Sequence, residues 1–346
     1  MTGSRPGWAK LRGCVVALAF CLAFPTLFPG SGVLNIALLT LMYVALASSW
    51  NILGGFAGYI SLGVSAFFGI GAYSMGLILE HLIHMSGGYG PFALVPLAGL
   101  IAAVVAIPLG WVALRTRHAV FATATIAIMF VFQLLATNLS GITGGSAGLG
   151  YPVPTWTGDF YDKPFYYAML VVAVVGVIIA WMVRRSGVGL GLLAIRDDED
   201  KAEAIGVPTW SYKLVAFVLS AFVAGMVGAV YGYYTTYIYP QFVIDPLISI
   251  GAALMAFLGG SGTLVGPVLG ALILEPAQLE LGFHVNGQIY LILYGAVFLF
   301  VILLMPRGIV PSVGALIDSR RARRRGAPLA APPPTQQPPT AEAVAR

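Results

Sequence analysis

Residues 167–181 read YAMLVVAVVGVIIAW, and residues 288–305 read QIYLILYGAVFLFVILLM. Neither run contains a charged side chain, and each is close to the length of about 20 apolar residues that an α-helix needs to cross a bilayer. Strands of a transmembrane barrel would alternate between apolar and polar residues, and these runs do not alternate. Both runs therefore predict membrane-spanning α-helices.

The whole chain has the same character. Its 346 residues are 59% hydrophobic and only 9% charged, whereas a soluble domain carries about 25% charged residues. We predict an all-α, polytopic membrane bundle of about ten transmembrane helices. The predicted apolar segments are 13–29, 33–53, 61–80, 91–114, 119–138, 165–183, 212–232, 246–258, 267–280 and 286–305. The segments within 246–280 are short and flank a glycine-rich stretch, so we expect a broken or re-entrant pair there.

Positive charge orients the bundle. With the N-terminus inside, the inner segments carry 17 of the 18 Lys and Arg residues, and only Lys163 lies outside. Loops that cross to the far side of the membrane are depleted in Lys and Arg, so both termini are expected in the cytoplasm. The inner segments are 1–12, 51–60, 115–118, 184–211 with Lys213, and 306–346. The net charge of +5 arises mainly after the last helix, which indicates contact with anionic lipids rather than with nucleic acid.

The expected organisation has three parts. A cytoplasmic N-terminus (1–12) precedes a transmembrane domain (13–312) that contains a long inner loop at 184–211. A tail at 313–346 is first basic and then rich in Pro and Ala. Such a composition cannot bury enough apolar area to fold, so we expect the tail to be disordered.

Glycine and serine interrupt the segment 51–73 and recur after residue 258. Frequent glycine allows close helix packing; irregular backbone at membrane depth also occurs beside a water-filled route. Both interpretations stay open. The candidate pathway or packing residues are Asn51, Gly58, Ser61, Gly63, Ser65, Gln133, Gly259, Gly260 and Gly262.

The inner loop combines an apolar stripe with dense charge between residues 190 and 207. This pattern predicts one short amphipathic helix on the cytoplasmic surface, ended by Gly206. A solvated linker helix is the alternative. The candidate residues of a contact with another protein are Leu193, Ile195, Arg196, Asp197, Asp198, Glu199 and Gly206.

Over residues 33–312 the chain resembles the ABC permeases of the branched-chain amino-acid type, in particular the larger of their two paired subunits. Single motifs are weak, but their order and spacing are specific. They are GYISLG (58–63), AFFGIGAY (66–73), TGG (143–145), AIRDDE (194–199), AIGV (204–207), YKLVAF (212–217), LGGSGT (258–263), GPVLGA (266–271) and PRG (306–308).

The resemblance implies a permease subunit of a bacterial importer in the inner membrane. It implies pairing with a second homologous permease, two cytoplasmic ATP-binding subunits and a periplasmic or lipid-anchored binding protein that delivers the small-molecule substrate. By analogy, the 190–207 helix would be the element that couples to the ATPase. ATP would be hydrolysed by the partners, because no glycine in this chain is followed by lysine as a P-loop requires. We therefore expect no cofactor, no metal and no catalytic residue.

Two departures leave the substrate open. Many relatives carry His-Ala where this chain has Val64 and Ser65, and charged residues at the positions of Phe130 and Gln133. Urea or short amides are therefore alternatives to branched-chain or other small amino acids. A self-sufficient secondary transporter or channel is less favoured, because such proteins carry ionisable residues deep in the bundle and the acids nearest the membrane, Glu275 among them, are expected at its outer ends. A membrane-embedded enzyme lacks any candidate nucleophile and base within the helices.

Overall fold

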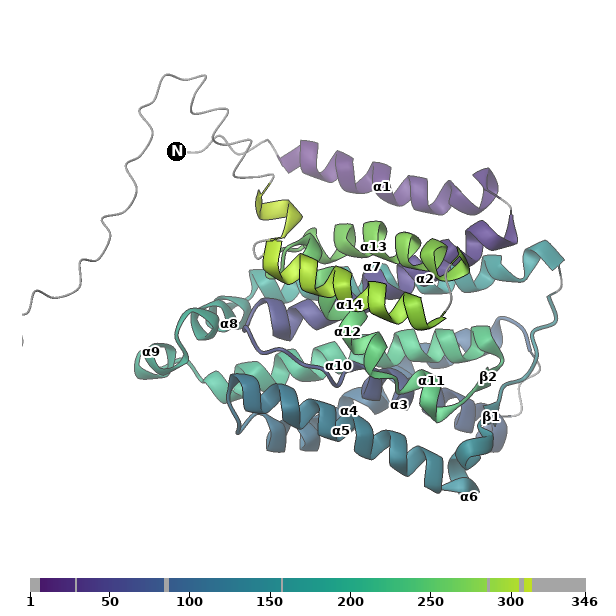
Figure 1. Cartoon of the computed structure of the whole chain (residues 1–346), viewed down its shortest axis with the longest axis horizontal. Helices are drawn as coiled ribbons and strands as arrows, with labels where there is room; N and C mark the ends of the chain where they lie inside the picture. Colours follow the sequence, from purple (N-terminus) through teal and green to yellow (C-terminus); the bar gives the residue numbers. More distant parts are fainter. Residues whose placement is uncertain are drawn as a thin grey trace, which may run out of the picture.

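The structure is a computed structural model that describes residues 7–28, 30–83, 87–156, 158–284, 287–304 and 308–312. It is a bundle of long helices that run side by side along one common direction (Figure 1). The helices of the first half are α1 (Gly7–Leu27), α2 (Ser31–Trp50) with the π-helical turn η1 (Asn51–Gly55), α3 (Val64–Leu77) with the π-helical turn η2 (Ile78–Leu82), the 3-10 turn η3 (Gly90–Leu94) with α4 (Val95–Ala113), α5 (His118–Asn138) and α6 (Ser140–Thr143).

The second half begins with short elements and returns to long helices. In chain order these are η4 (Gly145–Ala147), β1 (Leu149–Gly150), η5 (Gly158–Phe160), α7 (Asp162–Arg185), α8 (Gly187–Asp197), α9 (Glu199–Ala204), α10 (Thr209–Thr235), β2 (Tyr237–Ile238), α11 (Pro240–Val243), α12 (Pro246–Gly259), α13 (Gly266–His284) and α14 (Gly287–Leu304). The strands pair antiparallel, with Leu149 opposite Ile238.

Within the described residues, each of the ten predicted apolar segments falls on a separate long helix, so the all-α, polytopic membrane fold is confirmed. Six stretches are long and apolar enough by themselves to cross a bilayer. They are Ser31–Gly55, Gly90–Ala113, Ala119–Asn138, Asp162–Arg185, Thr209–Thr235 and Pro240–Gly259. Several predicted boundaries move by a few residues. α1 already begins at Gly7 rather than at residue 13, and the helix expected from residue 61 begins at Val64. The predicted tail at 313–346 lies outside the described residues.

The bundle has two distinct ends. α8 and α9 lie at one end, and α6, β1 and β2 lie at the opposite end (Figure 1). We call these the α8–α9 end and the β1–β2 end. Helix α1 begins at the α8–α9 end, and the short stretch 308–312 lies there too (Figure 1).

Helix α10 lies at the centre of the bundle. Of its most apolar stretch of 18 residues, 67% is buried, whereas only 22% of the corresponding stretch of α5 is buried. Glycines permit this central packing. A Cβ atom on Gly71 would come within 2.0 Å of the carbonyl oxygen of Gly225 in α10, and one on Gly228 within 1.9 Å of the carbonyl oxygen of Phe68. Small residues at helix contacts let backbones approach closely in membranes, where the hydrophobic effect does not drive helix association.

The predicted broken pair is a tight helical hairpin of α12 and α13 around residues 260–265. Gly260 and Gly262 hold the turn with φ of +118° and +79°, a region that glycine enters without steric cost. Behind the turn, a Cβ on Gly259 would come within 1.7 Å of the carbonyl oxygen of Gly266. α13 runs on to His284 and is longer than the expected segment.

The depth of Glu275 corrects one expectation. Its expected place is the outer end of the bundle, but it occupies the middle of α13 with only 4% of its surface exposed. The reason is the length of α13, which places this carboxyl halfway along the helix instead of near its end.

Candidate functional site

The expected single helix at 190–207 is in fact two helices, and Asp198 is the residue that separates them. Its backbone is extended (φ −165°, ψ 108°), and its Oδ1 accepts a hydrogen bond of 3.0 Å from the backbone N–H of Lys201. An aspartate in this geometry caps the N-terminus of a helix, so α8 ends before it and α9 begins after it. Ser186 caps α8 in the same way through the N–H of Gly189.

Gly206 ends α9, as expected. Its φ is +88°, its N–H donates to the carbonyl oxygen of Glu203 at 2.9 Å, and the N–H of Val207 donates to that of Ala202 at 3.0 Å. A glycine in the left-handed conformation is the usual residue after a helix C-terminus.

One face of the α8–α9 pair is part of the bundle core, and the other is open. Leu192, Ile195 and Ala202 are buried. Leu190 and Ile205 are apolar but 68% and 79% exposed, while Leu193 is half-buried and Asp197 is exposed. The candidate Ile195 therefore packs inside this chain, and the open face is made of other residues.

Arg196 joins α8 to both glycine-rich segments. Its Nη1 donates to the carbonyl oxygen of Gly55 at 2.7 Å. A Cβ on Gly262 would lie 2.3 Å from the same Nη1, and one on Gly58 would lie 3.2 Å from the Arg196 Cγ. Gly58 itself has a φ of +75°. The Arg196 side chain thus lies directly against Gly58 and Gly262, whose positive φ values favour glycine.

Asn51 fastens the two segments to each other. Its Oδ1 accepts from the N–H of Gly262 at 2.7 Å, and its Nδ2 donates to the carbonyl oxygen of Thr263 at 2.8 Å. We call Asn51, Gly55, Gly58, Arg196 and Gly262 the glycine junction. It satisfies backbone groups that the chain breaks would otherwise leave unpaired in a buried place.

Helix α9 contacts the core through a buried charged cluster of Tyr59, Glu199 and Lys213, which we call the Glu199 cluster. The Lys213 Nζ donates to the Glu199 Oε1 at 2.6 Å and to the Tyr59 hydroxyl at 3.2 Å. The Tyr59 hydroxyl donates to the Glu199 Oε2, and the Lys213 Nζ lies 4.5 Å from the centre of the Tyr59 ring. The side chains of Lys213 and Glu199 are only 4% and 7% exposed.

The cluster keeps Glu199 ionised. Burial alone would raise the pKa of its carboxyl, but hydrogen bonds from Lys213 and Tyr59 outweigh burial and hold that pKa below its ordinary value. The pKa of the Tyr59 hydroxyl is raised by burial and by the neighbouring carboxylate. Tyr59 therefore remains a donor at any physiological pH.

Sequence reasoning missed Tyr59 and Lys213, and it expected Glu199 to face a partner. The carboxylate instead points into this chain. The available signal was Lys213, a basic residue inside an apolar helix, 14 positions after an acid; intramembrane cations are usually paired.

Helix α9 also takes part in an ion pair that is exposed to solvent. The Arg117 Nη1 lies 2.9 Å from the Asp200 Oδ1 and connects α9 with the start of α5. The Asp200 carboxylate raises the pKa of the guanidinium of Arg117. Exposed pairs of this kind contribute about 0–1 kcal/mol, so the buried cluster determines where α9 lies.

Three other candidate residues lie nearby in close contact with neighbouring segments. The Ser61 carbonyl oxygen accepts from the Trp50 Nε1 at 2.8 Å, and a Cβ on Gly63 would come within 2.7 Å of the Thr125 carbonyl oxygen. The hydroxyl groups of Ser65 and Ser249 are hydrogen-bonded at 3.0 Å. Gln133 is separate, because its Nε2 donates to the Ile244 carbonyl oxygen at 2.9 Å, ahead of α12.

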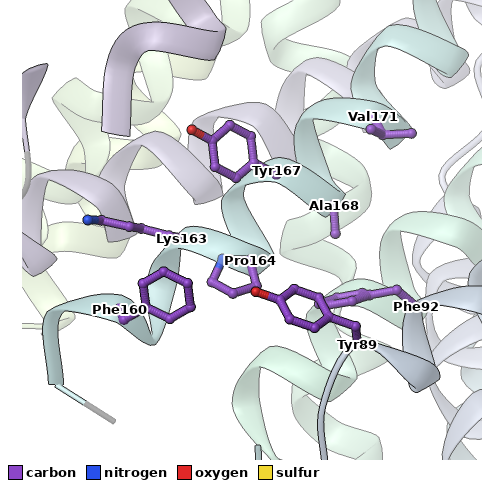
Figure 2. A pocket seen from close by; sticks show the side chains of 8 residues that line it. All are labelled: Tyr89, Phe92, Phe160, Lys163, Pro164, Tyr167, Ala168 and Val171. Atoms are coloured by element: carbon purple, nitrogen blue, oxygen red, sulfur yellow. The ribbon is translucent and has the colours of Figure 1, made fainter. Parts of the chain in front are cut away.

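An open pocket of about 450 Å³ lies elsewhere, where η5 leads into α7. Figure 2 shows the aromatic side chains of Tyr89, Phe92, Phe160 and Tyr167 around it, with Lys163 at one edge. The Lys163 Nζ lies 5.9 Å from the centre of the Phe160 ring. Since α8 follows the other end of α7, this pocket and the sites above lie at opposite ends of that helix.

These helices define a multi-pass α-helical membrane protein with a surface element, α8–α9, anchored in its core. The chain belongs to the family described as "Branched-chain amino acid transport system / permease component", which matches residues 32–302. That range includes both glycine-rich segments and the α8–α9 pair.

Relatives carry names that fit this family. The high-affinity branched-chain amino acid transport system permease protein LivM of Escherichia coli (strain K12) is 26% identical over 90% of this chain and 77% of its own length. LivH of the same strain is 24% identical over 78% of this chain and 91% of its own length. The probable LivM of Methanocaldococcus jannaschii is 21% identical, with 78% and 90% covered. No solved structure matches the chain.

Proposed function

We propose that this chain is a translocation subunit of an ABC importer for branched-chain amino acids. It forms half of the membrane pathway, pairs with a second homologous permease, and is driven by two cytoplasmic ATP-binding subunits. A periplasmic or lipid-anchored binding protein delivers the substrate. The family match over residues 32–302 carries this proposal, and the similarity to both LivM and LivH supports the pairing of two permeases.

Charge supports the orientation. Lys163 is the single base of 18 that falls outside the expected inner segments, and it lies in the first turn of α7, at the end away from α8. Because loops rich in Lys and Arg stay in the cytoplasm, the α8–α9 end faces the cytoplasm of a bacterial cell and both termini lie there.

The open face of α8–α9 docks on the ATPase. Leu190 and Ile205 supply exposed apolar area there, and Asp197 supplies charge. Apolar residues surrounded by charge are typical of a protein contact that excludes water at its centre. The buried face of the same helices holds this surface on the permease.

Purified complexes reconstituted in proteoliposomes test the function. Leucine uptake that requires both the ATPase subunits and ATP supports it, and competition by isoleucine and valine, but not by urea or acetamide, supports the substrate class. Leucine uptake without the ATPase subunits would identify a secondary transporter instead. In that case Glu275, which is buried in mid-helix, would be the first residue to substitute.

A further inference from the structure

We propose that the Glu199 cluster is a positioning device that couples ATP hydrolysis to transport, by tying α9 to α5 through the ring of Tyr59. This inference rests on the proposed function, because it assigns a task to residues inside the element that would bind the ATPase. Its three residues come from separate parts of the chain. Glu199 is the first residue of α9, Lys213 is in the first turns of α10, and Tyr59 lies in the irregular segment before α3.

The cluster is needed to hold α9 in place. α9 has only six residues, and a helix that short does not hold its position by its own hydrogen bonds. The ion pair from Asp200 to Arg117 is exposed to solvent, and the pair from Asp198 to Lys201, also exposed, lies within the first turn of α9 itself. Among the described residues, Glu199 is the one member of α9 that reaches the core through charged side chains that are almost fully buried.

Tyr59 carries the connection on to α5. Its ring packs edge-on against Phe121, with ring centres 5.4 Å apart, and Phe121 is completely buried near the start of α5. Next to it, the Leu62 N–H donates to the Thr125 Oγ1 at 3.1 Å. One short segment therefore bonds to α9 on one side and to the first turns of α5 on the other.

The two long helices joined by the cluster, α10 and α5, differ in the share of their residues that is buried. Lys213 belongs to the central α10, whereas α5 is the least buried of the six long spans. A force applied at α9 thus acts between a central helix and a helix that has fewer of its residues buried in this chain. We infer that α5 shifts relative to α10 when the ATPase subunits move α9, with Tyr59 as the contact that transmits the shift. Coupling of this kind needs a continuous physical connection, which these residues provide.

Stability alone does not account for the charges. Replacing a buried ion pair by apolar residues of similar volume is often neutral or stabilising, while removal of one partner is strongly destabilising. A purely structural contact at this place could therefore be apolar. The directional bonds among the carboxylate, ammonium and hydroxyl groups instead fix the orientation of α9 relative to Tyr59.

The test measures leucine molecules imported per ATP hydrolysed by the complete reconstituted complex. The variants are Tyr59→Phe, which removes only the hydroxyl, and Glu199→Gln with Lys213→Met, which removes both charges without leaving one unpaired. The matched control is Tyr166→Phe, since Tyr166 is also buried and donates to the Cys21 carbonyl oxygen at 2.9 Å in a contact far from the cluster.

The expected result is that both cluster variants assemble in normal amount and hydrolyse ATP, but import at least about fivefold less leucine per ATP, the lower end of typical coupling effects. The control should keep the wild-type ratio. An unchanged ratio in both cluster variants would overturn the inference, whether or not their amounts fall, because a merely structural role lowers uptake and hydrolysis together. If the wild-type complex showed no ATP-dependent uptake, the proposed function itself would fail.

Discussion

Asn51 and Gly262 are joined by a 2.7 Å hydrogen bond although they lie 211 positions apart in the sequence. The bond connects the end of α2 to the turn between α12 and α13, so a side chain at one break in the helical backbone binds backbone groups at the other break. Arg196 of α8 binds the carbonyl oxygen of Gly55 in the same place. The surface element and both irregular segments therefore form one packed unit.

Removing the Asn51 amide should destabilise the protein. Asn51→Ala leaves the N–H of Gly262 and the carbonyl oxygen of Thr263 without their partner, and an unsatisfied buried group costs about 1–3 kcal/mol. We expect a clear drop in the melting temperature in detergent. Asn138→Ala is the control, because the exposed Asn138 amide donates to the Leu134 carbonyl oxygen of its own helix. Equal melting temperatures for the two variants would contradict the junction's role.

Gly63 and Gly141 should respond differently to the same small change. A Cβ on Gly63 would lie 2.7 Å from the backbone oxygen of Thr125, whereas one on Gly141 would have nothing within 4 Å. Gly63→Ala therefore separates α3 from α5, and overpacking of this kind costs about 1–3 kcal/mol. Thermal unfolding and membrane yield should fall for Gly63→Ala and stay normal for Gly141→Ala. Normal values for both would mean that α5 does not pack on this segment.

Acid should weaken the Glu199 cluster. The pKa of Glu199 is lowered in the folded protein, so its contribution to stability is complete above the unfolded-state pKa of about 4.3 and is lost as pH falls through the lower folded-state pKa. The wild type should melt above Glu199→Gln at pH 7, and the difference should shrink below pH about 4. A difference that is constant down to pH about 3 would show that the ion pair does not form.

Much of this architecture follows from local sequence patterns. Apolar runs locate the helices because each run covers one span, and Gly206 ends α9 because the chain must turn there. Contacts between distant segments leave no such pattern. Nothing near Asn51 indicates Gly262, and Glu199 reads as a surface acid until Lys213 and Tyr59 are brought beside it. The break between α8 and α9 likewise leaves no clear local pattern, because Asp198 as a helix cap looks like one more acid in a charged run.

Because Glu199 is buried beside Lys213, reversing its charge should affect folding of the permease itself. Glu199→Lys would bury two ammonium groups beside each other, and breaking a buried pair typically costs about 3–5 kcal/mol. We expect the permease itself to be lost from the membrane, not only its contact with a partner. Membrane-inserted amount, measured by immunoblot, distinguishes these outcomes, and normal amounts would place Glu199 on the surface.

Membrane orientation is open to chemical labelling. In a variant without Cys14 and Cys21, a cysteine at the exposed Glu203 should react with a membrane-impermeant maleimide only from the cytoplasmic side, and one at Val153 only from outside. The expectation rests on the distribution of Lys and Arg and on the separation of the two ends in Figure 1. Reversed labelling would refute both the orientation and the ATPase contact.

Ile205 offers the most direct test of docking. It is 79% exposed at the α8–α9 end, and Val153 is 73% exposed in the connection between β1 and α7. Ile205→Asp and Val153→Asp each place a carboxylate on an exposed apolar position, so neither should disturb folding by more than about 0.5 kcal/mol. If the open face of α8–α9 binds the ATPase, Ile205→Asp alone introduces an unpaired charge into an interface, which lowers affinity because the charge loses its water without gaining a partner.

Co-purification of the ATPase subunits should therefore fall for Ile205→Asp, together with leucine-stimulated ATP hydrolysis, and should stay at wild-type level for Val153→Asp. Equal co-purification for both variants would mean that the ATPase binds a different surface.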